Sequence, residues 1–242
     1  MQWTRHHTGR FPERPYSSVD ELDHLCEQLI TTFLGSRHHH MAFPIATDDL
    51  TVLVQYLGAT LDASADLSAY ERMTHGCTEF IPGRRPLVQI ARRLSASPRY
   101  EHRLRTTLTH ACGHVWLHRP LYEARWRLGH LFEGGRRVTY RCAPTTILRA
   151  ISSNWAEWQA GYVSGALLMP ISALREVIRQ FLEREQVLRG PFPVSSPTGR
   201  LLVREVVAAF AVSDEAARVR LLHGGVLTEA PVVQGQLFGD FF

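Results

Sequence analysis

Long apolar stretches are missing from the sequence. No run of about eighteen apolar residues occurs, so we expect no transmembrane helix and no membrane association. The first residues, MQWTRHHTGRFPERPY, are polar and lack the apolar core of a signal peptide. The four cysteines are scattered without a CxxC pair, which argues against a disulfide framework and against a cysteine-based zinc site. These absences predict a cytoplasmic protein.

Motifs of several enzyme and binding classes are also absent. There is no Walker or GxGxxG loop and no convincing Ser/His/Asp or Cys/His triad. The formal net charge of +4 and the pI near 9.1 come from dispersed charges, which is weak evidence for nucleic-acid binding. With 242 residues, of which 45% are hydrophobic, the chain can form one domain with a sizeable core and a small appendage.

The first hundred residues combine helical and strand patterns. Residues 1–17 are expected to form an extended arm, followed by helices that begin near Ser18 and Thr47, each with a capping residue in front of its apolar pattern. Residues 78–81 and 87–91 flank a Pro-Gly turn and predict a β-hairpin. This mixture predicts an α+β fold with a small sheet among helices.

The remaining chain is mainly helical. A long helix is predicted from Pro98 to Pro120, which should end it, and Gly134-Gly135 predicts a turn. Further helices are expected over 154–169 and 172–188. The expected parts are the N-terminal arm (1–17), the main domain (18–190) and a helical C-terminal appendage (191–242), with a loop over 190–199 at the boundary.

The most informative motif is His110-Ala-Cys-Gly-His114 within the long helix. Residues at i and i+4 share one helix face, so both imidazoles can reach a single ion. Zinc accepts imidazole nitrogen, and a catalytic zinc site takes three protein ligands. An HxxxH pair is common by chance. Here the neighbouring helix positions are apolar, and two unpaired histidines among them would be costly to bury.

A third ligand is predicted at Glu157. It is the only carboxylate in residues 154–169, which are otherwise apolar, small or uncharged. A carboxylate on such a helix is poorly explained as part of a solvated face, although exposure beside Trp158 is the alternative. A metal ion would supply its counter-charge, and two imidazoles with one carboxylate favour zinc over manganese.

At these residues the chain resembles the ImmA/IrrE-type zinc metallopeptidases. The run RLRTTLTHACGHVWLH resembles the metal helix of that family, and EWQAGYVSGALLMP resembles its second signature. The resemblance covers roughly residues 15–190 and implies a zincin-like core with one Zn²⁺ on His110, His114 and Glu157. It also implies a structural or outer-sphere role for His118. Gly161 stands where the family often has Asn or Asp, so a hydrogen bond usual there is missing.

Ala111 is the main departure from the family. In an HExxH peptidase this position is Glu, which takes a proton from the attacking water and passes it to the leaving amine. Alanine can do neither, so we expect this chain to be inactive while it still binds zinc. A natural pseudo-enzyme and a deliberately replaced glutamate are the two explanations. We favour replacement, because the other elements of both signatures are retained.

The resemblance implies a metalloendopeptidase that cleaves a regulatory protein, such as a repressor or antitoxin-like partner encoded nearby, in stress response or on mobile elements. A protein substrate could add to the sheet as an extended strand. The strand next to the metal helix in sequence is our candidate for that edge: Leu87, Val88, Gln89 and Ile90. The first alternative is a non-catalytic zinc protein that binds the same regulator without cutting it.

The second alternative is a DNA-binding regulator. Helices predicted over 204–210 and 214–222, joined by a short turn, have the shape of a helix-turn-helix. Arg218 and Arg220 on the second helix are candidate nucleic-acid contacts. Asp214 and Glu215 stand where a recognition helix meets phosphate, so we favour packing or partner docking for this segment.

Overall fold

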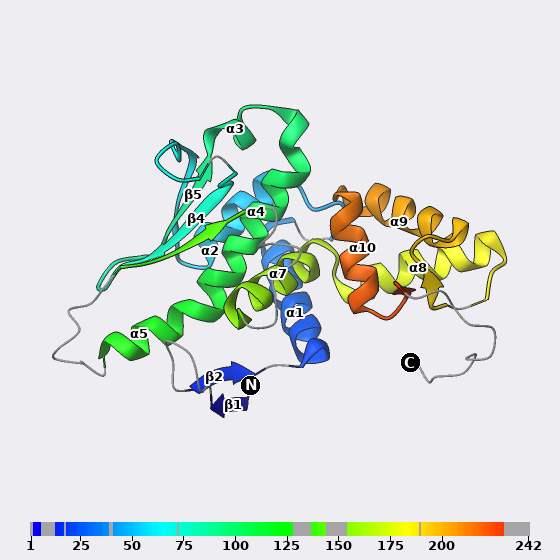
Figure 1. Cartoon of the computed structure of the whole chain (residues 1–242), viewed down its shortest axis with the longest axis horizontal. Helices are drawn as coiled ribbons and strands as arrows, with labels where there is room; N and C mark the ends of the chain where they lie inside the picture. The colour runs from blue at the N-terminus through cyan, green and yellow to red at the C-terminus, as the bar shows by residue number, and fades with distance from the viewer. Residues whose placement is uncertain are drawn as a thin grey trace.

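The structure, a computed structural model, has an α+β fold with one four-stranded mixed sheet (Figure 1). It describes residues 2–5, 13–16, 18–38, 41–71, 73–127, 137–143, 154–188 and 190–229. The predicted turn at Gly134-Gly135 and the last residues of the predicted appendage lie outside these ranges. In Figure 1 the sheet lies on the left and α8, α9 and α10 on the right, with α4 and α7 between them.

The N-terminal residues form paired strands and not a plain extended arm. Strand β1 (Gln2–Arg5) pairs antiparallel with β2 (Glu13–Tyr16). The two predicted helices follow as α1 (Val19–His38) and α2 (Thr47–Tyr56), which confirms them. The hydroxyl of Ser18 accepts a hydrogen bond from the Glu21 backbone N–H at 3.2 Å, as a helix cap requires.

The main sheet has the strand order β3-β5-β4-β6. The predicted hairpin is confirmed, because β4 (Gly76–Phe80) and β5 (Leu87–Ala91) pair antiparallel with Thr78 opposite Val88. Strand β3 (Thr60–Ala65) pairs parallel with β5, and β6 (Val138–Cys142) pairs antiparallel with β4.

The prediction that residues 87–90 form a sheet edge is therefore wrong. Strand β5 has β4 on one side and β3 on the other, so its backbone groups already have partners. The sequence pattern did not identify β3, which occupies the edge that β5 would otherwise present. Within the described residues the outer strands are β3 and β6.

The long predicted helix does not end at Pro120. Helix α4 (Glu101–Gly113) leads into a π-helical turn (His114–His118), and α5 (Arg119–Arg127) continues beyond the proline. Proline in an α-helix lacks its N–H bond and clashes with the carbonyl four residues earlier. The wider π turn lies directly before Pro120, which thus occupies the start of a new helical segment, where proline is tolerated.

The later helices match the prediction with small shifts in their ends. Helix α7 (Trp155–Leu168) stops before Pro170, and α8 (Ile171–Glu185) follows it. Helix α9 (Pro197–Phe210) begins earlier than predicted, so Gly199 lies in a helix and not in a loop. Helix α10 (Asp214–His223) is capped by Ser213, and the short strands β7 (Phe192–Pro193) and β8 (Leu227–Thr228) pair beside it.

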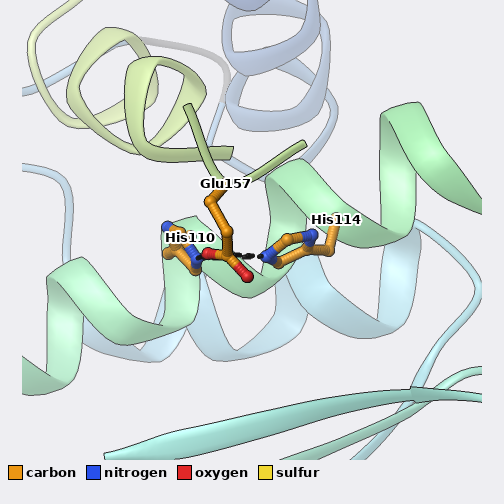
Figure 2. Close-up of side chains that lie close together, drawn as sticks. All are labelled: His110, His114 and Glu157. Atoms are coloured by element: carbon orange, nitrogen blue, oxygen red, sulfur yellow. Dashed lines mark hydrogen bonds and ion pairs between the residues drawn. The ribbon is translucent and has the colours of Figure 1, made fainter. Parts of the chain in front are cut away.

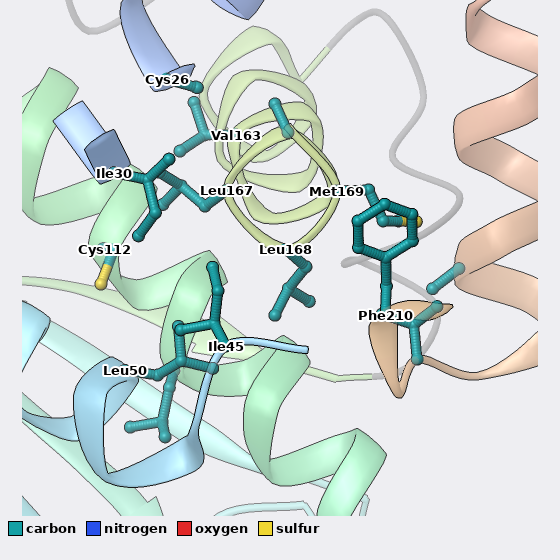
Figure 3. Close-up of a cluster of buried hydrophobic side chains, with 14 of the residues drawn as sticks. Cys26, Ile30, Ile45, Leu50, Cys112, Val163, Leu167, Leu168, Met169 and Phe210 are labelled. Atoms are coloured by element: carbon teal, nitrogen blue, oxygen red, sulfur yellow. The ribbon is translucent and has the colours of Figure 1, made fainter. Parts of the chain in front are cut away.

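One hydrophobic core joins the C-terminal helices to the rest of the molecule. Figure 3 shows Phe210 of α9 beside Met169, near residues from α1, α2, α4 and α7. Phe210, Leu221 and Leu167 belong to the same cluster and are each no more than 1% exposed. Arg105 of α4 also donates hydrogen bonds to the carbonyls of Phe210 and Ala211, at 3.2 and 3.1 Å. The described part of the predicted appendage, residues 191–229, therefore packs as part of the main fold.

Candidate metal centre

Helix α4 and the π turn after it place His110 and His114 on one face. Both side chains are buried, and their Nε2 atoms lie 3.1 Å apart. Gly113, between them, allows α4 to approach α7 closely, because a Cβ there would lie 2.8 Å from the Ala160 Cα. This close contact brings the first turn of α7 to the two imidazoles.

Glu157 lies in that first turn of α7 and points between the histidines (Figure 2). Its Oε2 is 3.1 Å from Nε2 of His110 and 3.6 Å from Nε2 of His114. The side chain is 8% exposed, so water does little to solvate its charge. The prediction that residue 157 faces the histidine pair, and not solvent, is confirmed.

The three donor atoms have the spacing of a metal site. Ligands held tetrahedrally about 2.0–2.1 Å from zinc lie about 3.3 Å from one another. The three observed separations are 3.1, 3.1 and 3.6 Å. Across the described residues, no other group of three histidine, cysteine or carboxylate side chains is arranged to hold a metal ion. Two imidazole nitrogens and one carboxylate oxygen fit zinc.

Electrostatics in this site suits a cation. Burial lowers the pKa of His114 to about 4, so its ring is neutral at pH 7 and one nitrogen has a free lone pair. Burial raises the pKa of Glu157, but its contacts with the two histidines, led by the 3.1 Å hydrogen bond from His110, outweigh that effect and lower the pKa below its usual range. The site therefore combines the negative charge of Glu157 with the neutral ring of His114.

His118 contacts the candidate centre through its side chain, whereas Gly161 has no side chain to do so. His118 is fully buried, and its Nδ1 lies 3.0 Å from Nδ1 of His114, on the side of that ring away from Glu157. His118 therefore contacts a candidate ligand without joining the donor triangle. Gly161 lies one turn after Glu157 in α7 and has no side chain to hydrogen-bond a ligand.

Ala111 is 5% exposed and belongs to the main hydrophobic cluster. It therefore leaves the centre without an acidic or basic group at this position. The neighbouring Cys112 is fully buried and burial raises the pKa of its thiol, so a nucleophilic role is excluded.

Sequence reasoning missed the aromatic side of the centre. Tyr140 of β6 stacks on His114 with ring centroids 4.2 Å apart, and its hydroxyl lies 2.6 Å from that of Tyr122. Trp155 packs edge-on against His118 at 5.3 Å. The alternation of Val138, Tyr140 and Cys142 with polar residues could have predicted the strand that carries Tyr140.

The candidate nucleic-acid contacts are engaged within the protein. Arg220 is 3% exposed, pairs with Asp23 at 2.8 Å and donates to the Tyr162 hydroxyl at 3.0 Å. Arg218 pairs with Glu215 at 3.0 Å and with Glu229 at 2.8 Å. The prediction that Arg220 is available to DNA is wrong, because its guanidinium is part of the core.

None of the helices within the described ranges is long and apolar enough to cross a membrane. Neither a protein-family model nor a curated protein matches the chain.

Proposed function

We propose that this chain is a zinc-binding protein of the metalloendopeptidase type that lacks its general base. The observation that carries the proposal is the buried triangle of two Nε2 atoms and one Oε2, with edges of 3.1, 3.1 and 3.6 Å. Three protein ligands with water in the fourth position is the arrangement of a catalytic zinc site, whereas structural zinc sites usually have four protein ligands.

The three ligands and residue 111 would have different roles in peptide hydrolysis. His110, His114 and Glu157 would hold one zinc ion, which when bound supplies Lewis-acid polarisation of a peptide carbonyl. A glutamate at position 111 would take a proton from the attacking water and give it to the leaving amine. General acid–base catalysis of this kind contributes about 10²–10⁴-fold to rate. With Ala111 in that position, this chain should bind metal and substrate but cleave very slowly.

A protein substrate is the favoured partner, and β6 replaces residues 87–90 as its proposed docking edge. An extended peptide would add to this strand through backbone hydrogen bonds. Tyr140 of this strand contacts His114, so a peptide added there would lie beside the donor triangle. The resemblance supports a repressor or antitoxin-like substrate.

A second candidate is a pseudo-peptidase that binds the same regulator without cutting it. The observation that favours it is the position of Ala111, which is well packed in the main hydrophobic cluster. A glutamate there would have to place its carboxylate at the margin of that core. The buried Arg220 and the paired Arg218 leave the DNA-binding alternative without support.

The test compares this chain with Ala111→Glu and Ala111→Gln, which differ from each other only in the presence of a base. Bound zinc is measured in each, and each is incubated with proteins encoded beside its gene. We expect about one zinc in all three and cleavage by Ala111→Glu alone. Zinc with no cleavage by any variant would favour the pseudo-peptidase. No zinc in any variant would overturn the proposal.

A further inference from the structure

A chain of buried polar groups extends from His114 away from the donor triangle. Nδ1 of His114 lies 3.0 Å from Nδ1 of His118, and Nε2 of His118 lies 3.3 Å from Oε1 of Gln159. His114, His118 and Gln159 are between 0% and 4% exposed. The order is therefore Gln159, His118, His114 and then the proposed metal position.

The donor and acceptor properties of these atoms determine which ring nitrogen of His118 and of His114 carries the proton. An amide oxygen only accepts hydrogen bonds, so Nε2 of His118 must be the donor to Gln159. A neutral imidazole has one N–H, and burial disfavours the charged ring, so Nδ1 of His118 is an acceptor. The 3.0 Å contact between the two Nδ1 atoms then requires the proton on Nδ1 of His114.

This proton position determines the state of Nε2, the other ring nitrogen of His114. With its proton on Nδ1, the ring presents a free lone pair at Nε2, the atom that faces His110 and Glu157. The opposite tautomer would point an N–H at the metal position and prevent ligation. Partners of this kind fix the orientation and tautomer of metal-binding histidines.

We propose that Gln159 is a positioning residue that acts through His118 to hold His114 in its metal-binding tautomer. This inference rests on the proposed zinc site and extends it. Two contacts restrict the rings: Tyr140 stacks on His114, and Trp155 meets His118 edge-on. Nδ1 of His110 has no hydrogen-bond partner among the described residues, so support of this kind falls on His114.

The first measurement is ¹⁵N–¹H correlation NMR of the histidine rings in the metal-free protein. We expect the N–H on Nδ1 of His114 and on Nε2 of His118. In Gln159→Met, which removes the acceptor at similar size, we expect a population of His114 with the N–H on Nε2. A proton on Nε2 of His114 in the unaltered chain would overturn the inference, and this spectrum remains decisive if Gln159→Met fails to fold.

The second measurement is zinc affinity by competition with a chelator. Gln159→Met should bind zinc about 10–100-fold more weakly than the unaltered chain, the usual effect of losing an outer hydrogen-bond partner. Gln180→Met, a change of an exposed glutamine on α8, is the control and should leave the affinity unchanged. Equal affinity of both variants would overturn the positioning role. Absence of zinc binding with the predicted tautomers would instead count against the proposed function.

Discussion

Glu157 contributes the only negative charge to the donor triangle, and its contacts make a specific substitution informative. The carboxylate approaches two imidazoles, with Oε2 3.1 Å from Nε2 of His110. A glutamine could keep a hydrogen bond to this histidine while removing the charge that a cation needs. Charge and packing at this residue can therefore be tested separately.

We expect Glu157→Gln to weaken zinc binding by at least about 100-fold, because loss of a direct ligand should exceed the 10–100-fold effect of losing an outer partner. Glu176→Gln, which changes an exposed carboxylate on α8, is the matched control. Chelator competition measures the affinity, and thermal melting reports the fold. Unchanged zinc affinity in Glu157→Gln would show that the carboxylate is not a ligand.

Some residues of the candidate centre could be predicted from the sequence alone, and others could not. His110, His114 and Glu157 were found because a four-residue helical spacing and a lone carboxylate in an apolar helix are local patterns. No local pattern marks Gln159, and the alternation around Tyr140 predicts only the strand and not its contact with His114. Their roles come from contacts of α7 and of β6 with the π turn, which are set by tertiary packing.

At the scale of elements, the contact between α4 and α7 sets the separation of the ligands. Gly113 meets Ala160 there, and Thr109 shares a 2.8 Å hydrogen bond with Ser164 along the same interface. Because the histidines come from one helix and Glu157 from the other, any increase in the helix separation moves the carboxylate away from both imidazoles.

Gly113→Ala should therefore impair stability and metal binding together. The new Cβ would lie 2.8 Å from Cα and 3.1 Å from the carbonyl oxygen of Ala160, and backbone atoms cannot yield as a flexible side chain can. Overpacking of this kind costs about 1–3 kcal/mol of unfolding free energy. Urea unfolding and zinc titration would measure the two effects.

Gly165→Ala is the control for that substitution, because its Cβ would meet only Arg220 Cδ at 3.6 Å, an ordinary contact. It should be neutral or stabilising by up to about 1 kcal/mol, since alanine favours helix. If both variants were equally stable and bound zinc equally well, the close approach at Gly113 would not control the site.

Prediction of elements from sequence succeeded where the apolar pattern was clear, as in α1 and the β4–β5 hairpin, and where a long apolar segment ends at a proline, as in α7. It failed at Pro120, where a π turn lets the helical path continue, and at β5, where an unidentified strand covers the predicted edge. Both errors share a cause. Helix continuation through a proline and strand order in a sheet depend on partners distant in sequence.

At the scale of the whole molecule, α4 lies between the sheet and the C-terminal helices (Figure 1). Arg105 of α4 bonds to the turn after α9, and Arg220 of α10 bonds to the Met169 carbonyl at 3.2 Å and to Tyr162 of α7. Both helices that carry the donor triangle are thus tied to the last described part of the chain. The C-terminal helices therefore help to hold α4 and α7, the helices that carry the candidate centre, in place.

Arg220→Met should destabilise the whole fold by about 3 kcal/mol, because breaking a buried ion pair leaves Asp23 without its counter-charge. Arg218→Met is the matched control on the same helix. Its partners are more exposed, so the expected loss is about 0–1 kcal/mol. Urea unfolding, followed by helical circular dichroism, should show one cooperative transition in both variants.

A double variant separates the charge from the packing. In Asp23→Leu with Arg220→Met neither charge remains, and such replacements of a buried pair are often neutral or stabilising. We therefore expect the double variant to recover most of the stability lost in Arg220→Met. A separate early transition for the C-terminal helices, or equal stability of Arg220→Met and Arg218→Met, would contradict the view that these helices fold as one unit with α4.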